Sequence, residues 1–367
     1  MILSLILVCT VMGIGNWLSN KTKSQLYFIS PPLISGIILF MITIVINRVF
    51  TIPLLVPNQL DRLFVSVFIF SIGVLMAFIY QRRHWLHLLY LSIGCGILLF
   101  FLQLIIFLVP SHFVLYAGSY MFAWNDEILK LIVPLEDQNT FYFWAMVELF
   151  IIFITTPIYL RLLEKRLIKK VPINIQSPPK LLSVKQPISI LVILLSIGIV
   201  WLNDRINFVL PFLFDFVFLG IIGYIFGRHM KQSWTKETVE TINEHIQQIG
   251  SIGLYGFIII QFHHVGILNW NLFDTKIFLF LIVKTFVLAI FIYIGIRWLF
   301  VYHSDNERVI VAIAGWTFIL NAPVTCMHGM RSVVNKYGPA HNILLIIPPV
   351  ILWIVNYIHL VTIKLFL

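Results

Sequence analysis

Two oppositely charged side chains, Glu148 and Lys284, lie inside otherwise apolar stretches of this chain. A charged group at membrane depth costs ~3 kcal/mol or more on insertion scales, so each is a candidate for function. A mutual ion pair would offset that cost, and for Lys284 we favour this structural role. Glu148 is also placed where a coupling proton could bind, so for this carboxylate both interpretations stand.

The stretch 307–349 is apolar at its flanks and is broken in its middle by Asn321, Pro323, Thr325, His328, Gly329 and Arg331. In lipid, irregular backbone survives only where protein or a water-filled cavity surrounds it. We therefore predict a re-entrant hairpin near 309–338 whose tip lies at a transport site. Thr325 and Asn321 could offer oxygens to sodium or hydrogen bonds to a substrate, or they could cap broken helix ends.

A weaker counterpart of that stretch, near 112–138, contains the carboxylates Asp126 and Glu127. These could take up a coupling proton, or they could lie in a solvated vestibule beside Lys130. Arg331 could bind the carboxylate of an anionic substrate in a bidentate way. For Arg331 we favour pairing with Asp126 or Glu127, or a position snorkelled to the membrane edge.

Composition places the chain in a membrane. Of its 367 residues 60% are hydrophobic and 11% are charged, whereas soluble domains average about 25% charged residues. The net charge of +10 sits in short gaps between apolar runs, which is typical of membrane topology rather than of a nucleic-acid surface. The Phe and Trp residues are assigned to lipid-facing surface and interfacial belts, so nucleic acid is not an expected partner.

Several classes of protein lack support in the sequence. Phosphate loops, HExxH motifs, paired CxxC motifs and nucleophile elbows do not occur, which argues against an ATP-driven pump and most membrane hydrolases. We do not expect an enzyme. The three cysteines, Cys9, Cys95 and Cys326, lack metal-site spacing. The adjacent His263 and His264 point about 100° apart on a helix, so we predict interior hydrogen-bonded histidines rather than a metal site.

Ten stretches are apolar over roughly the 20 residues that cross a bilayer. They are 1–18, 29–49, 63–80, 87–109, 140–162, 187–203, 208–227, 249–268, 277–300 and 341–364. Lys and Arg concentrate in the gaps that face inside when both termini are outside. The polar stretch 232–248 is predicted to be helical and to lie at the cytoplasmic interface as a connector.

A basic, proline-containing stretch at 163–186 is predicted to be a cytoplasmic linker between two halves, 1–162 and 187–367. Each half has five spans and one interrupted segment, and the first half begins outside whereas the second begins inside. The predicted fold is therefore an all-α polytopic membrane protein of about ten helices and two re-entrant hairpins, arranged as two inverted-topology repeats.

The C-terminal region resembles the glutamate:sodium symporter family of bacterial inner membranes. Matching residues follow the family's closing pattern of an A-x-P-T-rich hairpin, F-G-P-S-H and a terminal I-K-L, and they are Ala322, Thr325, Met330, Gly338, Pro339, His341, Pro348, Ile363, Lys364 and Leu365. Weaker matches lie at 29–36, 70–73 and 115–119. The resemblance implies a homodimeric inner-membrane symporter of glutamate, with Na⁺ as coupling ion and no cofactor.

The chain also departs from the family pattern. Residues 122–127, F-A-W-N-D-E, stand where the family has a glycine-rich run, and Asn356 stands where an Asp is expected. Two alternatives therefore stay open, a proton-coupled transporter of another anion and a non-transporting membrane protein that binds or assembles with a partner. Our candidate substrate-binding residues are Thr325, Asn321, Arg331, Ser119 and Asn125. Our candidate ion-coupling residues are Asp126, Glu127, Glu148 and Asn356.

Overall fold

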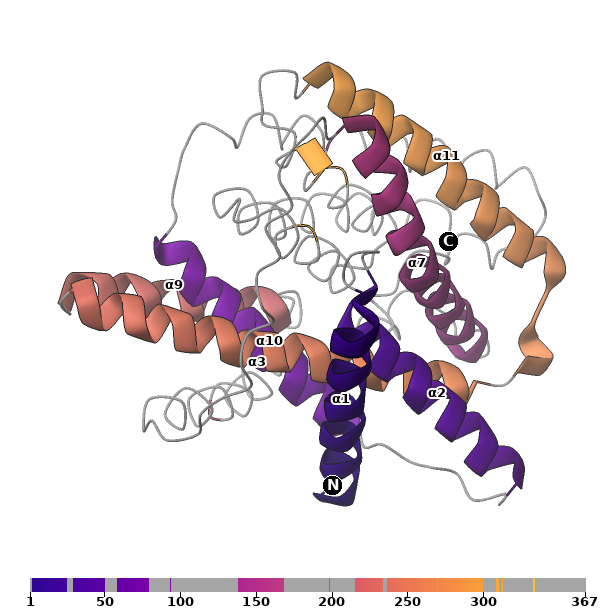
Figure 1. Cartoon of the computed structure of the whole chain (residues 1–367), viewed down its shortest axis with the longest axis horizontal. Helices are drawn as coiled ribbons and strands as arrows, with labels where there is room; N and C mark the ends of the chain where they lie inside the picture. The colour runs from indigo at the N-terminus through magenta and orange to yellow at the C-terminus, as the bar shows by residue number, and fades with distance from the viewer. Residues whose placement is uncertain are drawn as a thin grey trace. The chain divides into compact units, whose positions relative to one another are not determined.

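The computed structural model describes seven continuous parts of the chain and a few isolated positions. These are residues 2–24, 29–49, 58–78, 138–167, 215–233, 236–268 and 270–299, with single positions at 93, 198, 308, 309, 312 and 333. Every regular element within them is helical (Figure 1). The elements are α1 (Ile2–Thr22), α2 (Pro31–Val49), α3 (Asn58–Phe78), α7 (Gln138–Leu167), α9 (Asp215–Ser233), α10 (Lys236–Gly266), the 3-10 turn η4 (Trp270–Leu272) and α11 (Thr275–Leu299).

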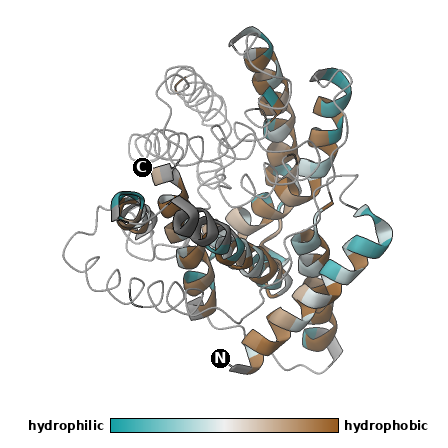
Figure 2. Cartoon of the chain, turned by 60° about the vertical axis from the view of Figure 1, so that its left-hand side comes forward, coloured by the Kyte–Doolittle hydropathy of each residue, from teal (hydrophilic) through white to brown (hydrophobic). Residues whose placement is uncertain are grey.

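Four of these helices are long and apolar enough to cross a membrane: α1, α7, α10 and α11. Figure 2 shows long hydrophobic stretches along the helices, with hydrophilic residues gathered in patches. The described part of the chain therefore has the character of an all-α membrane protein, as predicted. The spans predicted at 87–109, 187–203 and 341–364 lie outside the described residues, so the count of ten and the inverted repeats stay predictions.

Local sequence explains where several helices begin. Pro31 opens α2, a position where its missing N–H is no loss. Asp274 precedes α11, and its Oδ1 accepts a 2.8 Å hydrogen bond from the Lys276 backbone N–H, which caps the helix. At the other end of α1, Lys23 has φ 51°, the left-handed conformation that commonly ends a helix.

Two helices extend beyond the ends predicted for their apolar spans. The stretch 232–248, predicted to be a helical connector, is helical from Lys236 onward, and α10 continues from there without a break through the apolar span to Gly266. Similarly, α7 continues to Leu167, so the first residues of the predicted linker at 163–186 are helical. In both cases the helix extends past its apolar part, because charged residues such as Lys and Glu are also good helix formers.

The described helices fall into two compact units. Unit 1 contains α1, α2, α3, α9 and α10 as far as His263, whereas unit 2 contains α7, η4 and α11. Each unit takes helices from before and after the predicted linker. The compact units are therefore a different division of the chain from the two predicted sequence repeats, 1–162 and 187–367.

In unit 1, helix α9 packs against α3 through glycines. A Cβ added at Gly223 would meet the Phe70 carbonyl oxygen, and one added at Gly227 would lie 2.6 Å from the Val74 carbonyl oxygen. At Gly73 a Cβ would meet the Gly220 carbonyl oxygen. The two backbones approach so closely that larger residues do not fit, which is a common way for membrane helices to associate.

A second packing partner of α3 is α10, which also presents glycines. A Cβ at Gly253 would lie 2.7 Å from the Phe64 carbonyl oxygen, and one at Gly256 would lie 2.5 Å from the Phe64 ring. At Gly250 it would meet the Ser71 hydroxyl. Helix α3 is therefore held by close backbone contact on two sides.

Unit 2 has a core of bulky side chains between α7 and α11. The cluster contains Phe143, Trp144, Val147, Ile151, Ile277 and Leu281. The assignment of Phe and Trp to lipid-facing positions is therefore wrong for part of the chain. The largest fully buried side chains include Trp144, Phe141, Phe143 and Phe153 of α7, which pack against apolar neighbours as in a protein core.

Candidate functional site

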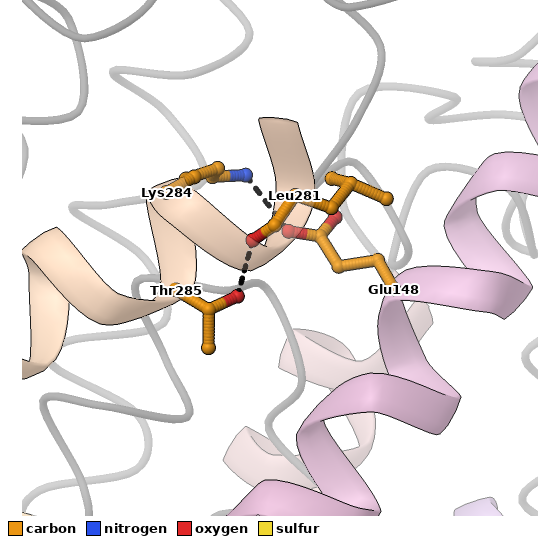
Figure 3. A network of polar contacts seen from close by, with 4 residues as sticks. All are labelled: Glu148, Leu281, Lys284 and Thr285. Carbon is orange, nitrogen blue, oxygen red and sulfur yellow. Dashed lines mark hydrogen bonds and ion pairs between the residues drawn. The ribbon is translucent and has the colours of Figure 1, made fainter. Parts of the chain in front are cut away.

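Helix α7 places Glu148 inside unit 2, opposite Lys284 of α11. The Lys284 Nζ lies 2.8 Å from the Glu148 Oε1, and the two side chains are 2% and 1% exposed. Figure 3 shows the carboxylate and the ammonium group pointing toward each other from the two helices. The ion pair predicted from the sequence is therefore present in the structure.

The neighbouring hydroxyl does not compete for this carboxylate. Thr285 donates its Oγ1–H to the Leu281 carbonyl oxygen of its own helix at 2.6 Å (Figure 3). Such a bond back to residue i−4 satisfies a buried Thr locally. The bond between Lys284 and Glu148, in contrast, crosses the interface between the two helices.

Helices α7 and α11 run in the same direction past this pair. Trp144 precedes Glu148 on α7, and it belongs to the same cluster as Ile277 and Leu281. Those two residues precede Lys284 on α11. Further along, the Tyr159 hydroxyl donates to the Ala289 carbonyl oxygen at 3.2 Å. Successive residues of α7 therefore meet successive residues of α11. The ion pair lies between the cluster around Trp144, which we call the aromatic end, and the hydrogen bond from Tyr159 to Ala289.

The aromatic end contains a residue that sequence reasoning missed. Trp144 is 1% exposed, and within the described part of the chain its indole Nε1 has no hydrogen-bond partner. Its ring lies 5.1 Å from Phe143 in an edge-on contact and 5.9 Å from Phe273, measured between centroids. The available signal was its spacing of four residues from Glu148, which places both on one face of a helix.

Unit 1 has a different polar site, formed by α2 and α10. The Thr43 Oγ1 and the His263 Nδ1 are 2.9 Å apart, and both residues are buried. Interior hydrogen bonding of this histidine was predicted and is confirmed. His264 is buried as well. Gln261, two residues before His263, is buried too, and in the described structure its amide has no hydrogen-bond partner.

The other predicted site residues lie outside the described residues. They are Thr325, Asn321, Arg331, Ser119, Asn125, Asp126, Glu127 and Asn356, together with both predicted hairpins. Glu148 alone among the predicted site residues is described, and the structure brings it to Lys284. Among described residues, no group of three or more His, Cys, Asp or Glu side chains is arranged to hold a metal ion.

The chain matches no family model, no curated protein and no solved structure. The resemblance to the glutamate:sodium symporter family therefore stays a prediction from the residues quoted above.

Proposed function

We propose that this chain is a secondary active transporter that moves a small organic anion across the membrane by alternating access. Glutamate is the substrate that the sequence resemblance indicates, with Na⁺ or H⁺ as coupling ion and no enzymatic activity. The proposed setting is a homodimer in a bacterial inner membrane, with both termini outside.

One observation carries this proposal: the buried Glu148–Lys284 pair between two apolar helices. Replacing a buried ion pair by well-packed apolar residues is often neutral or stabilising, so stability alone does not require the charges. Ionisable residues inside membrane helices typically mark ion or substrate pathways. A carboxylate paired with an amine in this position is suited to exchange a proton or an ion during transport.

The helix directions support the proposal independently. The predicted alternation of spans has 140–162 and 277–300 crossing the membrane in the same direction, and α7 and α11 do run the same way. The same alternation has 63–80 and 208–227 parallel, and α3 and α9 meet with Phe70 near Gly223 and Val74 near Gly227. The substrate-binding roles of Thr325, Asn321, Arg331, Ser119 and Asn125, and the coupling roles of Asp126, Glu127 and Asn356, belong to the same proposal.

Reconstitution into liposomes tests the function. We expect gradient-driven uptake of glutamate or a related carboxylate by the wild-type chain, with either a sodium or a proton gradient. Glu148→Gln should lose concentrative uptake, because a neutral amide cannot take up a proton and has no negative charge to attract Na⁺. Glu164→Gln is the matched control, since that carboxylate lies near the end of the same helix and is partly exposed.

A second candidate function is a membrane protein that binds or assembles with a partner and does not transport. The bulky Trp124 where the family has glycine favours it. This candidate predicts no uptake of any amino or dicarboxylic acid under either gradient, together with a stable complex with another membrane protein. That combination of results would replace the transporter proposal.

A further inference from the structure

Helix α1 has one face that α2 covers and one face that is exposed. On the covered face, a Cβ added at Gly15 would meet the Ser35 hydroxyl and would lie 2.9 Å from the Pro31 carbonyl oxygen. The exposed residues recur every three or four positions, and they include Leu3, Ile6, Thr10, Ile14, Trp17 and Lys21. Residues with this spacing lie on one side of a helix, so they form a continuous surface, which we call the α1 stripe.

The α1 stripe is apolar along most of its length and ends in two residues typical of a membrane boundary. From Leu3 to Lys21 it spans about 27 Å at the rise of an α-helix, close to the hydrocarbon thickness of about 30 Å. Tryptophan rings gather at the level of lipid headgroups, and a lysine keeps its ammonium group in the polar layer while its stem lies against apolar surface. The α1 stripe therefore suits lipid chains, and its end at Trp17 and Lys21 suits the headgroup layer.

The side chains of Trp17 and Lys21 are in contact with each other. The Lys21 Nζ lies 5.0 Å from the centroid of the Trp17 ring, which is within the range of a cation–π interaction. Trp17 is 60% exposed, and Lys21 is exposed too. Because an ammonium group has three N–H donors, the one on Lys21 can rest on the ring and still bind an anion.

The helices around this contact carry no acidic residue. Neither α1 nor α2, on which α1 packs, contains an Asp or a Glu. Among the described residues, no carboxylate forms an ion pair with Lys21. Lys23 adds a second positive charge two residues further along the sequence. The end of α1 therefore carries exposed positive charge that an anionic ligand can balance.

We propose that Trp17 and Lys21 bind the phosphate of an anionic phospholipid, such as a phosphatidylglycerol. The ammonium group pairs with the phosphate oxygens, the Trp17 ring beneath it restricts its position, and the acyl chains lie along the α1 stripe. Anionic lipids attract lysines that lie near the membrane surface. The inference concerns the contact between α1 and lipid, so it does not depend on the proposed transport.

Charge complementarity favours a lipid over a second copy of the chain as the occupant of the α1 stripe. In a twofold dimer formed through this stripe, the same surface of each copy would meet the other. Such a surface supplies no carboxylate from α1 or α2, and it brings two Lys21 side chains of like charge toward each other. An anionic headgroup supplies the missing negative charge.

Fluorine NMR of the full chain in lipid nanodiscs tests the inference, with every tryptophan replaced by fluorotryptophan. The resonance of Trp17 is identified by its absence from the spectrum of Trp17→Phe. We expect a nitroxide on the lipid headgroup to broaden this resonance more than a nitroxide in the middle of the acyl chain does. This order follows from the place of Trp17 at the end of the apolar stripe.

A titration of phosphatidylglycerol into phosphatidylcholine nanodiscs measures the preference for an anionic lipid. The Trp17 resonance should shift saturably, whereas the resonance of the buried Trp144 should not shift. Lys21→Gln should raise the half-saturating fraction of phosphatidylglycerol about fivefold, the factor expected for one lysine at an anionic surface. Lys231→Gln is the matched control, because that lysine is exposed in the last turn of α9, and it should titrate as the wild type does.

Three results would overturn the inference. A Trp17 resonance that neither nitroxide broadens would show that protein covers the α1 stripe, as in a dimer formed through α1. Equal half-saturation in Lys21→Gln and the wild type would remove the ammonium group from the site. The same shift with inorganic phosphate in pure phosphatidylcholine nanodiscs would show a site for free phosphate instead of one for a lipid.

Discussion

Unit 1 brings its helices together at glycines, whereas unit 2 joins α7 to α11 through bulky rings and an ion pair. Helix α3 meets the backbones of α9 and α10 at Gly223, Gly227 and Gly253. Helix α7 has no glycine at all, and its contact with α11 is built from Phe143, Trp144 and Glu148 and their partners.

This difference teaches how two kinds of contact can serve one membrane protein. Lipid tails are as apolar as leucine side chains, so membrane helices associate through close packing and polar bonds rather than through the hydrophobic effect. A glycine contact has a single geometry, because there is no side chain to rearrange. The contact in unit 2 instead depends on two opposite charges, so it should respond strongly to the removal of either one.

The largest expected effect comes from removing half of the ion pair in unit 2. Glu148→Leu leaves the Lys284 charge buried without its carboxylate, and we expect this to lower the free energy of unfolding by about 3–5 kcal/mol. The double variant Glu148→Leu/Lys284→Leu should recover most of that loss, because it leaves no buried charge. Denaturant unfolding of the reconstituted protein measures both.

If the single and double variants were equally unstable, the loss would come from altered packing rather than from the unpaired charge. Lys276→Leu serves as the control, since it removes an exposed lysine of α11. It should change the free energy of unfolding by no more than about 0.5 kcal/mol.

A glycine substitution in unit 1 should have the next largest effect. In Gly223→Ala the new methyl group would meet the Phe70 carbonyl oxygen and would lie 3.1 Å from the Val74 nitrogen. Because both are backbone atoms, the helices must separate, and we expect a loss of about 1–3 kcal/mol. The midpoint of thermal unfolding should fall accordingly.

The same helix offers a matched control for this substitution. At Gly220 an added Cβ would meet only the Ile69 Cγ2, at 3.9 Å, which is ordinary van der Waals contact. Gly220→Ala should therefore leave the stability unchanged or slightly higher, since Ala has the better helix propensity. Equal losses at both positions would show that α3 and α9 are not held by close backbone approach.

Much of the described fold could be predicted because the thickness of a bilayer sets the length of a helix that spans it. The spans predicted at 29–49 and 277–300 correspond to α2 and α11 within two residues. The Glu148–Lys284 pair was also predictable, since two isolated opposite charges in apolar spans gain by meeting. A helix within 232–248 was expected too, but its unbroken continuation into the span at 249–268 was not, because hydropathy marks only the part of a helix in lipid.

The packing partners were harder to predict than the helices. Glycines at 220, 223 and 227 have helical spacing, but the sequence does not say that α3 is the helix they meet. Trp144 illustrates the same limit, since hydropathy gives one value to an aromatic ring in lipid and to one in a core. The structure separates the two by burial, at 1% exposed for Trp144 and 80% for Trp298.

The smallest expected effects come from the neutral hydrogen bonds, one in each unit. Thr43→Val in unit 1 removes the 2.9 Å bond to the His263 Nδ1, and Tyr159→Phe in unit 2 removes the 3.2 Å bond to the Ala289 carbonyl oxygen. Interhelical hydrogen bonds in membrane proteins average about 0.6 kcal/mol, so both variants should lose about that much.

Thr10→Val is the control for Thr43→Val, because both hydroxyls bond back to their own helix at 2.8 Å and, of the two, Thr43 alone also bonds to a histidine. Similar small losses in the two units would show that glycines and charge, rather than neutral bonds, make the units differ. A loss of several kcal/mol in Thr43→Val would instead show that the bond to His263 is a main source of stability in unit 1.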